Sequence, residues 1–144
     1  MVVKYKLVIE VKISTKGRYA LSIMAYLASH YNEDNYITLK EISEKENISL
    51  KYLERIIASL NKEGYLLSQR GSEGGYKLSK SPKEYTLYDI ISKAEGNIAI
   101  TSCVNSKFLC SKKGECRSFK LWNDLNQVII NFLDGKTLED FIKE

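Results

Sequence analysis

The sequence predicts a mainly helical fold with one small β-hairpin. Three observations support this prediction: apolar residues recur at helical spacing over much of the chain, helix-capping signals precede several of these stretches, and one glycine cluster separates two short strand-like runs. The chain has 144 residues, of which 44% are hydrophobic and 28% charged. It is therefore long enough for one domain and apolar enough to form a packed core.

The N-terminal half begins with three helical stretches. Residues 15–31 have helical periodicity, and a polar loop follows them. A capping box that begins at Thr38 predicts a short helix over 39–46, in which the threonine hydroxyl and a glutamate three residues later satisfy free N–H groups reciprocally. After a brief turn, Ser49 can cap a longer helix over 50–63. The short helix, the tight turn and the longer helix have the order of a helix-turn-helix.

A hairpin follows this arrangement. Gly64 lies where a left-handed C-cap is expected, and the runs 65–70 and 76–78 have strand character. The glycine-rich segment 71–75 joins the two runs as a hairpin tip. A hairpin in this position predicts a winged helix-turn-helix. Residues 2–13 alternate loosely and could add a further strand.

The C-terminal half contains two more capping boxes, at Thr86 and Thr137. The first predicts a helix that ends near residue 95, and residues 97–116 are expected to be irregular. Residues 117–134 form a strongly amphipathic helix in this prediction. Its apolar side consists of Leu121, Trp122, Leu125, Val128, Ile129 and Phe132.

The charge distribution favours an anionic partner for the N-terminal half. Residues 1–80 contain 13 Lys and Arg against 9 Asp and Glu, whereas residues 81–144 contain 9 of each. No apolar run approaches the roughly 20 residues of a membrane span, and the N-terminal stretch lacks the apolar core of a secretory signal. Three cysteines are an odd number and too few for a disulfide framework, so a cytoplasmic location is expected.

Enzymatic activity is not expected. The sequence shows no nucleophile–base pair and no Walker-type phosphate loop, and it contains a single histidine, His30.

The predicted fold has side chains suited to reading DNA, because a helix fits the major groove and its N-terminal residues reach base edges first. In the helix over 50–63 these residues are Lys51, Tyr52, Glu54 and Arg55. The hairpin contributes an arginine and small residues that let the backbone approach phosphate, namely Arg70, Gly71, Ser72, Gly74 and Gly75. Each feature also has an ordinary explanation: a solvated helix face, a core tyrosine, or a simple turn. Their combination in this order favours DNA binding.

The sequence resembles a known family at three motifs, Lys12–Leu21, Ile48–Arg55 and Arg70–Lys77. The family is that of the small bacterial winged-helix regulators that includes IscR, NsrR and CymR. The similarity extends from about residue 12 to the C-terminus. It implies a homodimer whose dimerisation helix is 117–134, with two recognition helices that read a pseudo-palindromic duplex.

The resemblance also implies roles for individual residues. Lys51, Tyr52, Glu54 and Arg55 match recognition-helix positions, Arg70 matches a minor-groove arginine, and Ser49, Lys16 and Arg18 match phosphate contacts. A carboxylate such as that of Glu54 accepts from cytosine N4 but repels phosphate, so it would discriminate between sites rather than add affinity.

The resemblance divides the chain into three parts. Residues 12–82 are expected to be the DNA-binding domain and residues 83–144 to carry the cysteine loop and the dimerisation helix. Family members usually begin near Lys12, so residues 1–11 are either an N-terminal extension or the result of a misassigned start.

The cysteines follow the pattern Cys103-x6-Cys110-x5-Cys116. Clustered thiolates suit zinc or an iron–sulfur cluster, although this spacing matches neither common zinc patterns nor ferredoxin motifs, and structural cysteines remain an alternative. The resemblance favours the iron–sulfur cluster, because cluster-binding members carry three cysteines in this loop and the CymR type lacks them. The cluster type, 2Fe–2S or 4Fe–4S, stays open.

A fourth cluster ligand is not evident. Some relatives use a histidine where this chain has Phe119, and others use a carboxylate from the partner subunit where this chain has Arg18. His30 is expected to be a helix-end residue. Two other functions stay open: a cluster-free regulator with a zinc or thiol switch, and a protein-interaction winged helix.

Overall fold

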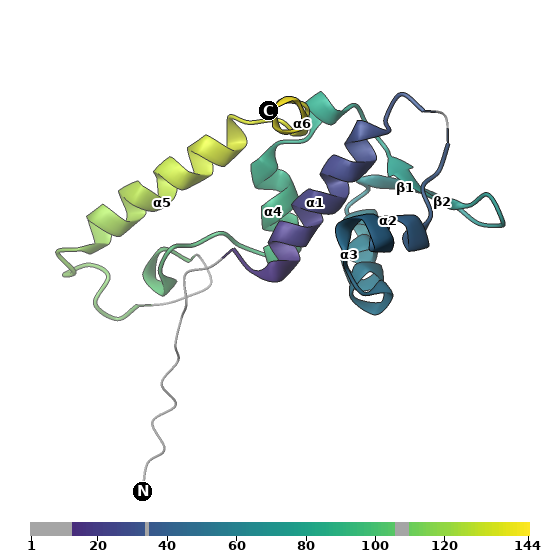
Figure 1. Ribbon diagram of the computed structural model, residues 1–144. Coiled ribbons are helices and arrows are strands. Elements are labelled where there is room, and N and C mark those ends of the chain that lie inside the picture. The colour runs from purple at the N-terminus through teal and green to yellow at the C-terminus, as the bar shows by residue number, and fades with distance from the viewer. Residues whose placement is uncertain (1–12, 34, 106–109) are drawn as a thin grey trace, which may run out of the picture.

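The computed structural model describes residues 13–33, 35–105 and 110–144. These residues form helices around one antiparallel hairpin (Figure 1). The helices are α1 (Thr15–Ser29), α2 (Leu39–Glu46), α3 (Leu50–Lys62), α4 (Leu87–Glu95), α5 (Phe119–Asp134) and α6 (Leu138–Lys143), with short 3-10 turns η1 (Pro82–Glu84) and η2 (Ser102–Val104). The strands are β1 (Leu66–Gln69) and β2 (Gly75–Leu78).

The predicted winged helix-turn-helix is confirmed. The turn between α2 and α3 is made by Asn47 in a left-handed conformation, with φ 52°, and Gly64, with φ 75°, lies just after α3 as expected. The hairpin extends away from the helices at the side of α2 (Figure 1). An unpredicted bridge between Ile37 and Tyr76 ties its second strand to the segment before α2, with N···O distances of 2.8 and 3.0 Å.

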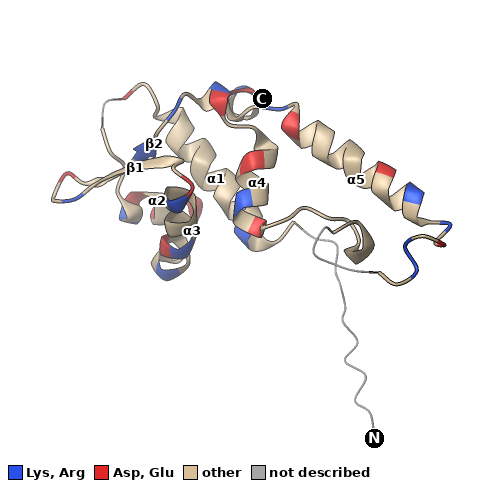
Figure 2. Cartoon of the chain, turned by 180° about the vertical axis from the view of Figure 1, so that it is seen from behind, with Lys and Arg blue, Asp and Glu red and all other residues tan. Residues whose placement is uncertain are grey.

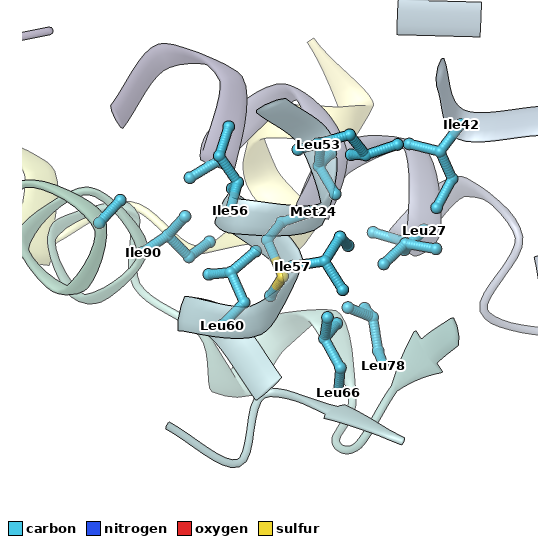
Figure 3. Packing of buried hydrophobic residues seen from close by; sticks show 14 of the residues in the cluster. Met24, Leu27, Ile42, Leu53, Ile56, Ile57, Leu60, Leu66, Leu78 and Ile90 are labelled. Carbon is cyan, nitrogen blue, oxygen red and sulfur yellow. The ribbon is translucent and has the colours of Figure 1, made fainter. Parts of the chain in front are cut away.

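One apolar core connects these elements (Figure 3). The periodic positions of α1 and α3 are buried and face the hairpin residues Leu66 and Leu78. Ile90 from α4 and Leu138 from α6 are fully buried in the same cluster. The core therefore extends across the proposed division between residues 12–82 and 83–144, and that division concerns function rather than packing.

The capping signals located the helices correctly, but among the described residues the predicted reciprocal bond is missing at Thr38 and at Thr86, where the threonine accepts from the Asp89 N–H without a return bond. At Thr137 both hydrogen bonds of a capping box are present. At Thr38 the side chain accepts from the Glu41 N–H, whereas the Glu41 carboxylate accepts from the Tyr26 hydroxyl of α1 at 2.8 Å. Burial and this bond raise the pKa of Tyr26 to about 12. The carboxylate therefore connects α2 to α1 instead of completing the cap.

Helix α5 projects to one side of the other helices (Figure 1). It begins at Phe119, two residues later than expected, and ends at the predicted Gly135. Its inner face holds the segment between α4 and η2, because the buried Asn126 side chain accepts the Ile100 N–H at 3.0 Å. Its outer face leaves large apolar side chains exposed, namely Leu121, Trp122, Leu125, Val128 and Phe132.

Replacing Asn126 by alanine is expected to lower the free energy of unfolding by about 1–3 kcal/mol, because the buried Ile100 N–H would lose its acceptor. Urea unfolding followed by circular dichroism measures this change. Exposed Asn123 on the same helix is the control position, where the alanine variant should unfold like the wild type. Equal stability of both variants would show that the Asn126 bond contributes nothing.

Two predictions lie outside the described residues. The possible strand over residues 2–13 falls almost entirely within residues 1–12, as does the N-terminal extension or misassigned start assigned to residues 1–11. Among the helices in the described ranges, none combines the length and the apolar character needed to cross a membrane.

Candidate nucleic-acid interface

The solvent-facing side of α3 carries the predicted recognition residues. Lys51, Glu54 and Arg55 are exposed, while the apolar positions of the same helix face the core. Charges of both signs lie along α3 (Figure 2). Tyr52 is half-buried, with its ring edge-on to Tyr19 of α1 at a centroid distance of 5.8 Å. Tyr52 therefore belongs partly to the packing, one of the two explanations considered for it.

Ser49 precedes α3 at the N-cap position, but the expected side-chain cap is wrong. Within the described chain its hydroxyl makes no capping bond. The Ser49 carbonyl instead accepts from the backbone N–H groups of Tyr52 and Leu53 at 3.0 and 2.9 Å. The Ser49 side chain is exposed.

The hairpin tip has two kinds of residue. Arg70, Gly71 and Ser72 are exposed, as a DNA-contacting wing requires. Gly74 and Gly75 have structural reasons to be glycine. A Cβ on Gly74 would lie 2.4 Å from the Gln69 carbonyl oxygen, and one on Gly75 would lie 2.3 Å from a carbonyl oxygen in the strand-like segment before α2. The sequence motif therefore also encodes close backbone packing.

An open groove of about 630 Å³ brings these elements together. It is lined by the start of α2, by residues of α3 and by the hairpin, including Lys40, Leu50 and Arg70. Residues of α3 and of the hairpin thus line the same groove.

Lys16 and Arg18 lie in the first turn of α1. Arg18 is exposed, and its guanidinium donates to the Thr15 hydroxyl at 3.3 Å; Lys16 is half-buried. The ring contact between Tyr19 and Tyr52 joins this helix to α3.

The cysteines lie in the segment between α4 and α5. Cys103 is in η2, with its sulfur 3.0 Å from the Thr101 hydroxyl, and Cys110 is half-buried. Cys116 is exposed just before α5. In the described ranges, no three His, Cys, Asp or Glu side chains are gathered closely enough to hold a metal. The three thiols are suitable donors for zinc or for the iron of an iron–sulfur cluster, but the described geometry does not bring them together.

The surroundings of the Cys116 thiol lower its pKa. The Ser118 hydroxyl, 3.3 Å from the sulfur, lowers the pKa of Cys116, with further contributions from the backbone of Ser118 and Phe119 and from Lys112. A lowered thiol pKa favours the thiolate, which is the form that binds metal and reacts with oxidants.

His30 is a helix-end residue, as expected. It is the C-cap of α1, its Nδ1 lies 2.9 Å from the Tyr26 carbonyl oxygen, and its ring is 4.6 Å from that of Tyr26. These contacts give the ring a local structural role.

Two side chains that hold distant segments of the chain together were missed by the sequence analysis. Glu95, at the end of α4, accepts hydrogen bonds from the start of α1, and Asn126 holds the backbone of the cysteine-bearing segment. Both contacts join residues far apart in the chain, so local pattern gave no signal. The one available indication was the position of Asn126 among apolar residues of α5.

The fold and the exposed side chains define a winged helix-turn-helix of the DNA-binding kind. The chain belongs to the Rrf2 family, described as iron-dependent transcriptional regulators, whose model matches residues 13–144. It is therefore a DNA-binding transcriptional regulator and not an enzyme, as expected from its motifs.

Relatives support this assignment. The HTH-type transcriptional regulator IscR of Aliivibrio salmonicida is 37% identical over 131 residues, 91% of this chain and 77% of the relative. The structure of CymR, the global cysteine regulator of B. subtilis, has a TM-score of 0.75 at 37% identity and covers 92% of this chain and 96% of its own. The structure of IscR from T. potens has a TM-score of 0.72 at 36% identity, covering 92% and 86%.

Proposed function

We propose that this chain is a cytoplasmic homodimer that binds a pseudo-palindromic DNA operator and senses iron–sulfur, redox or nitric-oxide status through a cluster on Cys103, Cys110 and Cys116. One observation supports the DNA-binding part: the exposed charged residues of α3 follow Leu50, which lines the same open groove as the hairpin residue Arg70. The cytoplasmic location follows from the proposed function, because bacterial DNA lies in the cytoplasm.

The proposed DNA contacts fall into three groups: contacts made from the major or minor groove, phosphate contacts made by side chains, and close approach of the wing backbone. Lys51 and Arg55 would reach base edges or phosphates from the major groove, and Arg70 would enter the adjacent minor groove. Lys16, Arg18 and Ser49 would contact phosphate, where cations and hydroxyls fix the register of the protein on the duplex. Gly71, Ser72, Gly74 and Gly75 would let the wing backbone come close to the sugar–phosphate chain.

Glu54 sets sequence preference in this proposal. Glu54→Ala is expected to relax discrimination between the operator and variants with single base changes, while affinity for the operator changes little, because a carboxylate can accept from cytosine N4 and repels phosphate. Fluorescence anisotropy with a set of labelled duplexes measures both quantities. Glu44→Ala, which removes an exposed carboxylate from α2, is the control and should keep wild-type discrimination. Unchanged discrimination in Glu54→Ala would refute the role.

The proposal of a homodimer is supported by the apolar outer face of α5. Its apolar side chains recur at helical spacing and are 36–63% exposed in the single chain. An apolar stripe of this size on one helix is typical of a partner interface. A second copy of the same helix would cover it.

The proposal of an iron–sulfur cluster is supported by the donor chemistry of the cysteines and by the family of the chain. Three thiols occur within 14 residues, from 103 to 116, one of them with a lowered pKa. The chain belongs to a family described as iron-dependent. A bound cluster would supply iron that reacts with oxygen or nitric oxide. Cys103, Cys110 and Cys116 would hold the cluster through their thiolates.

An absorption spectrum of protein purified without oxygen, with iron and sulfide analysis, tests the cluster. The proposal predicts visible bands and stoichiometric iron and sulfide, both lost in Cys116→Ser. Colourless protein that resists reconstitution would overturn it.

A cluster-free regulator is the second candidate. The structural likeness to CymR, a global cysteine regulator, is as strong as that to IscR, with TM-scores of 0.75 and 0.72. The lowered pKa of Cys116 suits a thiol switch as well as a metal ligand. Colourless protein with bound zinc, or DNA affinity that changes with reversible thiol oxidation, would support it. A winged helix that binds proteins would instead show weak DNA affinity without salt dependence.

A further inference from the structure

The start of α1 is capped by a carboxylate from a distant part of the chain. Glu95, the last residue of α4, directs Oε1 at this end of α1. The oxygen accepts the Ser14 N–H at 2.7 Å, the Ser14 hydroxyl at 2.8 Å and the Gly17 N–H at 3.0 Å. Ser14 in turn accepts from the Lys16 N–H at 3.2 Å. Because the first N–H groups of a helix have no partner within it, the carboxylate and the Ser14 hydroxyl together cap the start of α1.

Gly17 makes this approach possible. It is buried, and a Cβ added to it would lie 2.2 Å from the Glu95 carboxylate oxygen. Glycine in a helix is normally less favourable than alanine. Its presence at this position is thus explained by the space that the carboxylate occupies.

The same turn carries proposed DNA contacts. Lys16 and Arg18 flank Gly17, and one residue further the Tyr19 ring packs on Tyr52 of α3. The N–H groups of Lys16 and Gly17 already donate to the Ser14 hydroxyl and the Glu95 carboxylate. In the proposed function, DNA would therefore be contacted there through the two cationic side chains, whose position depends on where the helix starts.

We propose that Glu95 is a positioning residue for DNA binding, which holds the first turn of α1, and with it Lys16 and Arg18, in register with α3. This inference rests on the proposed DNA-binding function. In this inference Glu95, which lies in α4 outside the winged helix, helps to determine where Lys16 and Arg18 meet phosphate.

The test compares the operator affinity and its salt dependence in wild type, Glu95→Ala, Glu95→Gln and Gly17→Ala by fluorescence anisotropy. Glu95→Ala is expected to lose at least about tenfold in affinity and to reduce the slope of log K against log salt by about 1–2, since each lost phosphate contact removes about 0.9. Glu95→Gln keeps an acceptor oxygen and should retain most of the affinity. Gly17→Ala should resemble Glu95→Ala, although alanine favours helix.

A double-mutant cycle separates positioning from general destabilisation. In a Lys16→Ala/Arg18→Ala background, Glu95→Ala should change affinity less than about threefold, because the contacts it positions are already gone. Thr137→Ala is the matched control: it removes the N-cap of α6, which carries none of the proposed contacts, and should leave the salt slope unchanged.

An unchanged salt slope in Glu95→Ala, or an equal loss of affinity in both backgrounds, would overturn the proposal. If Glu95→Ala does not fold, Gly17→Ala and Glu95→Gln give the same comparison. Wild-type protein that binds no duplex would instead refute the proposed function, on which this inference depends.

Discussion

Replacing Leu125 and Val128 by aspartate should convert the dimer to a monomer and lower operator affinity by more than about 100-fold, because linked half-sites gain that order of avidity. The two side chains are 43% and 63% exposed in the single chain, at the centre of the apolar face of α5. Charges at that position would have to be buried without partners in a dimer. Light scattering gives the molar mass, and anisotropy gives the affinity.

The control for this variant places the same charge elsewhere on the helix. Asn123→Asp/Gln127→Asp changes two exposed polar residues of α5 and should remain dimeric with wild-type affinity. If the Leu125/Val128 variant stays dimeric, α5 is not the dimer interface.

Removing three cations from the proposed interface should abolish tight DNA binding. We expect Lys51→Ala/Arg55→Ala/Arg70→Ala to lose at least about 3 kcal/mol, since single base-edge or groove contacts contribute about 1–3 kcal/mol each. The side chains are exposed, so the fold should keep its thermal stability. Binding isotherms at several salt concentrations measure the affinity and the number of phosphate contacts together.

A charge-matched variant controls for the net charge. Lys120→Ala/Lys136→Ala/Lys143→Ala removes three cations of α5, α6 and the link between them, where the lysines pair with Asp or Glu side chains. Because these residues lie outside the α3–wing surface, operator affinity should fall much less. Equal losses in the two variants would mean that binding depends on overall charge, not on this interface.

Local patterns located the helices and the wing because their causes are local. The threonine at the start of α2 and Gly64 after α3 act within a few residues of themselves, and each lies at the helix end that the sequence predicted. Apolar periodicity likewise identified the buried faces of α1 and α3. The side chain of Ser49 departed from the pattern, because the first turn of α3 uses its backbone carbonyl instead.

Contacts between distant segments could not be predicted in the same way. Glu95 binds the start of α1 across 78 and 81 positions, and Asn126 binds Ile100 across 26. Glu41 was expected to close its own capping box, and it binds Tyr26 instead. In each case a polar group met a partner that only the packed fold brings within reach.

The most direct test of DNA binding by the α3–wing surface is selection of random-sequence duplexes by the purified wild-type protein, followed by sequencing. The account predicts an enriched pseudo-palindrome whose half-sites are centred about one helical turn apart, roughly 10–10.5 base pairs, and loss of enrichment in Lys51→Ala/Arg55→Ala/Arg70→Ala. Enrichment of no motif, or the same motif with that triple variant, would contradict it.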